Sequence, residues 1–303
     1  MKRVLLPAAL LLSACATVAS TEPQPEIAIT VDDLPVHGSY PPGATPQQVA
    51  DQMLAAFRAA GVSGAYGFVN AVKVQDQPET ERVLQDWRAA GMMLGNHGWS
   101  HRSLSDMSIA EFEHELVKDE PVLARNAGPS DWHWFRYPFL DEGKDPAQRA
   151  AAREVLAKHG YRVTAVSMSF SDWQWTAPYA RCMARHDSAA VAELERMYLA
   201  AARESIAASR DAAHKLLGRD IPYVLLMHVS AMSAHMMPQL LDLYRTAGFR
   251  FVSLPQAESD PAYRRFTDPR LPSPPSPQEL AKAKGVALMR PTDYAAKLES
   301  MCA

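Results

Sequence analysis

The sequence has little cysteine, little net charge and only a short apolar run near its start. Three cysteines among 303 residues exclude a scaffold held together mainly by disulfides. The formal net charge of −3 excludes a broad basic field, so we expect no nucleic-acid partner. The apolar run Val4–Leu12 is too short to span a bilayer. What remains is an ordinary globular composition, 48% apolar and 21% charged, with no internal repeat.

The N-terminal stretch has the pattern of an export signal. Cationic residues 2–3 precede the apolar run, and the run ends in "LSAC" at positions 12–15. This pattern resembles a bacterial lipoprotein signal, which is cut before the cysteine that receives the lipid. We therefore expect a signal peptide over 1–14, lipidation at Cys15 and a tether over 15–25. The chain would then lie on the periplasmic side of a bacterial membrane, held by its lipid anchor. A plain secretory peptide with a later cleavage site is the alternative.

Two further cysteines, Cys182 and Cys302, would lie in an oxidising compartment after export. There they could form a disulfide, and two unpaired thiols are the alternative.

Strand-like and helix-like runs alternate along the chain, which indicates parallel β-α-β units in an α/β fold. Periodicity does not distinguish a barrel from an open doubly wound sheet. The expected strands are Ile27–Val31, Ala65–Val69, Met92–Gly95, His133–Arg136, Tyr161–Val166, Tyr223–His228 and Phe249–Ser253. The expected helices include Pro46–Ala60, Glu79–Ala90, Ile109–Leu123, Pro146–His159 and Ser233–Ala247, with one long helix or two between Asp187 and Leu217. We expect one catalytic-sized domain over 26–260 and a Pro-rich extension over 261–303, wrapping the domain and containing a helix at Pro277–Lys284.

Polar residues gather where the expected strands end. Asp32 and Asp33 follow the first strand, "NHGWSHRS" follows the third, "RYPF" the fourth and "SDW" the fifth, and His228 ends the sixth. In parallel α/β folds these ends collect the active-site groups. Two adjacent carboxylates repel each other, so they either cap a turn or face something positive.

His97 and His101 are spaced i, i+4, which on a helical turn puts both imidazoles on one face. That spacing suits one metal ion, although such pairs often face solvent. A carboxylate from another strand end would complete a His-His-Asp site with open positions, which is typical of catalysis.

The motifs occur in the order of a known family. "TVDD", "HGWSH", "RYPF", "SDW" and "LMH" resemble the motifs of the polysaccharide deacetylases of the NodB-homology group, also called carbohydrate esterase family 4. The resemblance implies a distorted (β/α) barrel of about seven parallel strands. It also implies a divalent metal, most often zinc, with cobalt and nickel compatible with the same ligands.

The resemblance also implies roles for individual residues. Asp33, His97 and His101 would bind the metal. Asp32 would act as general base, taking a proton from the attacking water. Arg136 would hold Asp32 in place and keep its pKa low, and Asp172 would in turn hold Arg136.

The substrate side is implied in the same way. The Phe139 backbone N–H would stabilise the oxyanion, and His228 would protonate the leaving amine. Trp173 and Leu226 would form the wall of an acetyl pocket. Trp99, Trp173 and Trp175 lie near the strand ends and could stack on sugars, with a place in the core as the alternative for each of them. His37 could reach the site, but we expect it on a surface loop.

We therefore expect a metal-dependent hydrolase that removes N-acetyl groups from an N-acetylated glycan. The chain departs from the family pattern at Ser169, Gly98 and Phe139, where Asp, Ser or Thr, and Tyr are more usual. These departures bear on the substrate and not on the reaction. An O-acetyl esterase or a non-sugar amidohydrolase on the same site, and a lipid-anchored glycan-binding protein without activity, are the alternatives.

Overall fold

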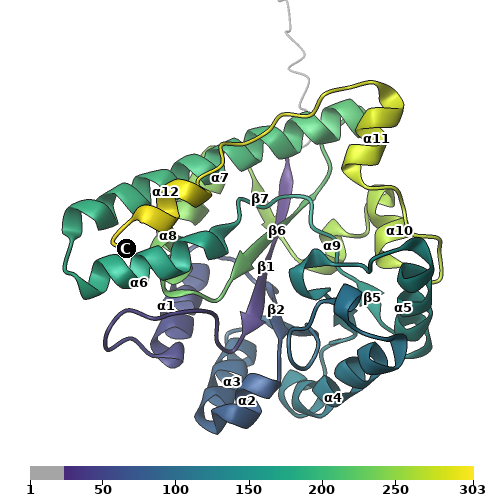
Figure 1. Ribbon diagram of the computed structural model, residues 1–303, viewed down its shortest axis with the longest axis horizontal. Coiled ribbons are helices and arrows are strands. Elements are labelled where there is room, and N and C mark those ends of the chain that lie inside the picture. The colour runs from purple at the N-terminus through teal and green to yellow at the C-terminus, as the bar shows by residue number, and fades with distance from the viewer. Residues whose placement is uncertain (1–23) are drawn as a thin grey trace, which may run out of the picture.

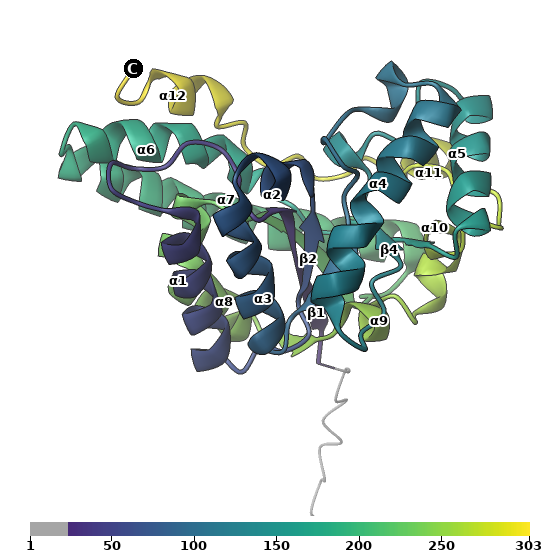
Figure 2. The same cartoon turned by 90° about the horizontal axis from the view of Figure 1, so that it is seen from below.

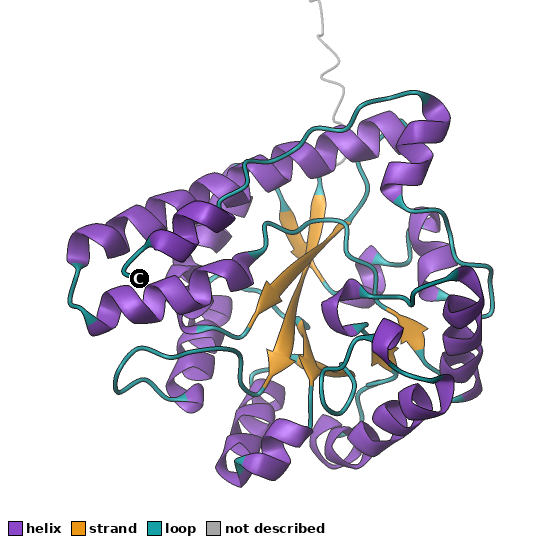
Figure 3. Cartoon of the chain, in the orientation of Figure 1, coloured by secondary structure: helices purple, strands orange, loops and turns teal. Residues whose placement is uncertain are grey.

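The computed structural model describes residues 24–303. The expected signal peptide, Cys15 and almost all of the expected tether lie outside the described residues. Seven parallel strands form one sheet at the centre of the molecule, in the order β5-β4-β3-β2-β1-β6 with β7 beside β1 (Figure 3). The strands are β1 (Glu26–Leu34), β2 (Tyr66–Val69), β3 (Met93–Asn96), β4 (Trp134–Phe135), β5 (Arg162–Val163), β6 (Tyr223–His228) and β7 (Arg250–Val252). All seven expected strands are therefore present.

Strand β1 lies inside the sheet and pairs with three other strands. Its residues 27–32 pair with β6 along one edge. On the other edge β7 pairs with its first residues and β2 with its last ones. Every residue of β1 after Glu26 is buried, as the near-continuous apolar run predicts for a parallel strand covered on both faces.

The sheet curls until its two ends meet. The chain leaves β5 after two residues, and Met168 then forms a parallel bridge with Leu225 on the free edge of β6. The Met168 backbone donates to Val224 and accepts from Leu226. This single bridge closes a distorted barrel, which confirms the expected fold class and excludes the open sheet.

Helices surround the barrel (Figures 1 and 2). In succession α7, α8, α1, α3, α4 and α5 each contact the next around the outside. The helices are α1 (Pro46–Ala59), α2 (Val72–Asp76), α3 (Glu81–Ala89), α4 (Ile109–Ala127), α5 (Pro146–Lys158), α6 (Thr176–Ala184), α7 (Ser188–Leu217), α8 (Ala231–Thr246), α9 (Leu254–Ala257), α10 (Arg264–Thr267), α11 (Pro277–Lys284) and α12 (Ala295–Ser300). The stretch between Asp187 and Leu217 is thus one helix. No helix within residues 24–303 has the length and apolarity to cross a membrane.

The chain after α11 runs along α7 and ends beside α6 (Figure 1). The backbone at Ala287, Met289 and Thr292 forms hydrogen bonds with successive side chains of α7, at Lys215, Asp211 and Glu204.

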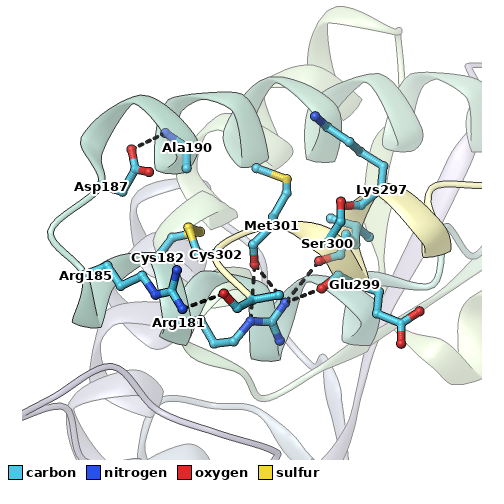
Figure 4. The surroundings of a disulfide bond; sticks show 12 residues. Arg181, Cys182, Arg185, Asp187, Ala190, Lys297, Glu299, Ser300, Met301 and Cys302 are labelled. Carbon is cyan, nitrogen blue, oxygen red and sulfur yellow. Dashed lines mark hydrogen bonds between the residues drawn. A yellow bond between two sulfur atoms is a disulfide. The ribbon is translucent and has the colours of Figure 1, made fainter.

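Cys302 forms a disulfide with Cys182 of α6 (Figure 4). Arg181 donates to the carbonyls of Leu298, Glu299 and Met301 next to this bond. The sequence leaves a disulfide and two free thiols as alternatives, and the structure has the disulfide.

Candidate metal centre

The carboxyl ends of β1, β3 and β6 bring the polar residues together. Asp32 and Asp33 lie near the end of β1, and His97 directly follows β3. His228 is the last residue of β6 and lies in register with Asp32 on the neighbouring strand. Parallel strands end at the same edge of a sheet, so this grouping follows from the topology.

Asp33, His97 and His101 form a candidate metal site. Their ligand atoms all lie within 4.8 Å of one another. Asp33 Oδ1 is 3.6 Å from His97 Nε2 and 3.3 Å from His101 Nε2. These are the three residues that the resemblance names as ligands, and the fold brings them together.

The donor set fits a divalent cation. Asp33 Oδ1 is buried and has no hydrogen-bond partner, so a positive ligand would satisfy it. The Nδ1 atom of His97 lies 2.7 Å from the Arg136 carbonyl, to which it donates. That bond leaves the Nε2 lone pair facing Asp33, the tautomer that a metal needs.

Burial keeps both imidazoles neutral. It lowers the pKa of His97 well below its usual value, and it lowers that of His101 as well. Burial alone would raise the pKa of Asp33, but the His37 hydrogen bond and the nearby Lys73 charge bring it well below its ordinary value. An ionised carboxylate beside neutral imidazoles is the protonation state of a ligand set.

Unusual backbone conformations carry these ligands. Asp33 and His101 both have positive φ, 71° and 55°. His97–His101 is an irregular loop and not the expected helical turn, with Gly98 at φ 72° between the two histidines. Non-glycine residues in this region cost free energy and cluster at functional sites.

Asp32 lies beside the ligands but has different neighbours. Its carboxylate is 3.4 Å from Arg136 Nη1, and Arg136 also donates to Thr30 Oγ1. Burial raises the pKa of Asp32 to about 6, against the opposing charge of Arg136. The contact expected between Arg136 and Asp32 is therefore present, but the expectation of a low pKa is wrong, because burial outweighs the Arg136 charge.

Asp172 does not hold Arg136, contrary to expectation. Its Oδ1 lies 2.9 Å from His228 Nδ1, and its Oδ2 accepts from the His228 backbone N–H and the Ser233 hydroxyl. The physical reason is position, because Asp172 begins a 3₁₀ turn (Asp172–Trp175) that packs against β6. Burial lowers the pKa of His228, but the hydrogen bond and charge of Asp172, together with the charges of Asp32 and Asp33, raise that pKa to about 9.

The expected substrate-side residues divide into exposed and buried ones. Phe139 is 68% exposed and its ring lies 4.4 Å from that of His101, whereas Trp173, which follows Asp172 in the chain, is 50% exposed. Leu226 is buried two residues before His228 on β6, on the same face of the strand. Trp99 and Trp175 are buried at 9% and 1% exposure. Neither of these two is free to stack on a sugar, since both belong to the main core cluster.

His37 lies on a loop as expected, but its side chain contacts the site instead of facing solvent. Its Nδ1 is 2.5 Å from Asp33 Oδ2, and its ring lies 4.8 Å from that of His228. Spacing in the sequence carries no signal for this contact. It requires the backbone to reverse after Asp33, where φ is positive.

Comparison with known proteins points to one family. The family model described as polysaccharide deacetylase matches residues 19–164. The resemblance to the polysaccharide deacetylases is confirmed. The matched stretch contains the motifs at Asp32, His97 and Arg136, whereas those at Asp172 and His228 follow it.

Solved structures share the fold. A chitin deacetylase from Colletotrichum lindemuthianum matches with 19% identity and a TM-score of 0.54, over 81% of this chain and 92% of its own. A family 4 carbohydrate esterase from Streptomyces lividans, in complex with acetate, matches with 19% identity and a TM-score of 0.50, over 77% and 95%. A family 4 pseudoenzyme from Bacillus anthracis matches with 13% identity and a TM-score of 0.54, over 77% and 65%. The match to the family model supports the predicted polysaccharide deacetylase, and the solved structures, at 13–19% identity, support its fold.

Proposed function

We propose that the protein is a metal-dependent hydrolase that removes N-acetyl groups from an N-acetylated glycan. The observation that carries the proposal is the placement of Asp32 and His228 on paired strands, beside the ligands Asp33, His97 and His101. Two residues suited to opposite proton transfers thus share one site with a metal-ligand set. Zinc fits His-His-carboxylate ligands, and cobalt or nickel would fit them as well. When bound, such a cation polarises the acetyl carbonyl and acidifies water.

The remaining chemistry belongs to the side chains. Asp32 takes a proton from the attacking water, and the adjacent Arg136 favours its ionised form. The oxyanion that develops on the acetyl oxygen is stabilised by the backbone N–H of Phe139. Phe139 has φ 59°, a backbone conformation that residues at functional sites adopt at a cost.

Protonation of the leaving amine is the role of His228. Asp172 accepts from its Nδ1, so Nε2 is left to serve the substrate. The raised pKa of about 9 keeps the imidazole protonated at neutral pH, as a general acid requires. Trp173 and Leu226 border the acetyl pocket in this proposal.

Acetate release from acetylated substrates tests the proposal. Purified, zinc-loaded protein is assayed on N-acetylglucosamine, on its tetramer and on O-acetylated xylan at equal acetyl concentration. We expect turnover of N-acetyl groups, with kcat/KM several-fold higher for the tetramer because remote sugars add binding energy. Equal rates on monomer and tetramer would indicate a small-molecule amidohydrolase. Faster release from xylan would indicate an O-acetyl esterase, and no release a glycan-binding protein.

We also propose that the chain is exported and lipid-anchored through Cys15. The "LSAC" pattern at 12–15 motivates this, and the Cys182–Cys302 disulfide is compatible with an oxidising compartment. Intact-mass analysis of membrane-extracted protein should show a lipid-modified Cys15 as the first residue. An unmodified N-terminus downstream of Cys15 would contradict the anchor.

A further inference from the structure

His37 contacts the one carboxylate of the proposed metal site. Its Nδ1 lies 2.5 Å from Asp33 Oδ2. An ionised carboxylate only accepts hydrogen bonds, so Nδ1–H of His37 is the donor. The His37 side chain is 17% exposed and that of Asp33 8%, so water competes little for this bond.

This hydrogen bond makes the two carboxylate oxygens of Asp33 different from each other. Oδ2 is held by His37, whereas Oδ1 has no hydrogen-bond partner. Oδ1 is also the oxygen nearest the imidazoles, 3.3 Å from His101 Nε2 and 3.6 Å from His97 Nε2. A carboxylate free to rotate about χ2 would exchange its two oxygens. The bond to His37 removes that freedom and leaves one oxygen to ligate.

The loop that carries His37 is itself fixed. The backbone N–H of Val36 donates to the Asp33 carbonyl at 3.0 Å, which closes the turn between the two residues. Gly38 has φ 65°, and a Cβ at this position would lie 2.6 Å from the Cγ2 atom of Thr176. The loop therefore rests directly on the start of α6, and His37 has a defined position from which to act.

We propose that His37 is a positioning residue that orients Asp33 and thereby raises the affinity of the site for its metal. The proposal rests on the metal site of the proposed function. His37 is not one of the three candidate ligands, and it would act on a bound metal only through Oδ2 of Asp33. Hydrogen-bond partners of metal ligands commonly contribute about 10–100-fold to metal affinity, because they orient the ligand before the metal arrives.

The test measures zinc affinity and not catalysis. The wild type, His37→Phe and His37→Asn are titrated with zinc in competition with a chromophoric chelator. His37→Phe keeps a ring but removes the donor, so its zinc Kd should rise about 10–100-fold. His37→Asn places an amide N–H close to where Nδ1 lies, so its Kd should return to within several-fold of the wild type. A merely structural role for the ring would produce the opposite order, because Phe resembles the ring better than Asn does.

His159→Phe is the matched control. His159 forms a similar pair, with Nε2 2.7 Å from Glu113 Oε1, between α5 and α4. Its removal should leave the zinc Kd unchanged. The proposal is overturned if His37→Phe and the wild type bind zinc equally, or if His37→Asn binds as weakly as His37→Phe. A wild type that binds no zinc overturns the proposed function together with this inference, so the two failures are distinguishable.

Discussion

Two clusters at the same edge of the barrel both contain aspartate and histidine side chains, but the pKa values of these side chains differ between the clusters. After the roles proposed above, we call Asp33, His97 and His101 the ligand cluster, and Asp32, Arg136, Asp172 and His228 the proton-transfer cluster. In the first, the pKa values of the carboxylate and the imidazoles are all lowered, so none holds a proton that a metal would have to displace. In the second, the pKa of Asp32 is raised to about 6 and that of His228 to about 9.

The difference lies in the neighbours, because burial is common to both clusters. Asp32 and Asp33 are adjacent and both are buried, yet their pKa values move in opposite directions. Asp33 accepts the His37 hydrogen bond and lies near Lys73, whereas Arg136 only partly offsets the burial of Asp32. One pair of carboxylates thus supplies a permanent anion and a group that can exchange a proton.

Removal of a ligand should have the largest effect. Asp33→Ala, His97→Ala or His101→Ala leaves two donors, which is too few for tight binding of a divalent cation. We expect both bound zinc, measured by elemental analysis, and acetate release to fall to background. Retention of bound zinc together with full activity in any of the three variants would remove that residue from the ligand cluster.

Removal of the base should separate the two clusters. Asp32→Asn keeps the shape of the side chain but cannot accept a proton, so the rate should fall about 10²–10⁴-fold. Bound zinc should stay at the wild-type level in the same preparation. If Asp32→Asn loses zinc while Asp33→Asn keeps it, the roles of the two neighbours are exchanged.

Much of this arrangement is visible in the sequence because local patterns determine it. Apolar runs mark the strands, and parallel strands ending at one edge bring Asp32, Asp33, His97 and His228 together. The contacts that the sequence does not reveal are those that depend on the path of the chain between strands. Asp172 follows β5, but the segment after β5 crosses to β6, so Asp172 meets His228 and not Arg136.

The sequence also does not show which individual side chains are buried, because burial depends on the same path of the chain. Trp175 and Trp173 lie in one 3₁₀ turn, but only Trp173 faces solvent. Trp175 packs in the core against Tyr198 of α7 and Tyr294 of the C-terminal segment, which lie far away in the sequence. His37 reaches Asp33 only because the backbone turns between Asp33 and Val36, and no periodicity marks that turn.

Removal of the proposed general acid, His228, should lower the turnover of amides more than the turnover of esters. An amine leaves poorly unless a proton arrives as the C–N bond breaks, whereas an alkoxide leaves more readily. His228→Asn should therefore lower N-acetyl turnover about 10²-fold and O-acetyl turnover by less. The rate should also lose its decline at alkaline pH, because that decline reports the deprotonation of His228. Equal losses on amide and ester would assign His228 a role other than proton donation to the leaving group.

The smallest effect on activity is expected from the substitution of Glu258, a carboxylate outside both clusters. This substitution tests how much burial alone raises a carboxyl pKa. Glu258 is buried, with Oε1 accepting from the Ala165 N–H and Oε2 2.5 Å from Thr267 Oγ1. Burial raises its pKa from 4.5 to about 8. The unfolded chain therefore releases this proton at lower pH than the folded one. As a result the contribution of this group to the free energy of unfolding falls as pH rises from about 4.5 to about 8.

Glu258→Gln mimics the protonated acid, since its amide can accept from Ala165 and donate to Thr267. Urea titrations at pH 5 and pH 7 should show a smaller loss of stability in this variant than in the wild type, with acetate release unchanged. Glu154→Gln, an exposed glutamate of α5, is the control and should keep the wild-type difference. If Glu258→Gln kept that difference as well, burial alone would not raise a carboxyl pKa in this fold. The opposite pKa shifts of Asp32 and Asp33 could then no longer be explained by different neighbouring charges around two buried carboxylates.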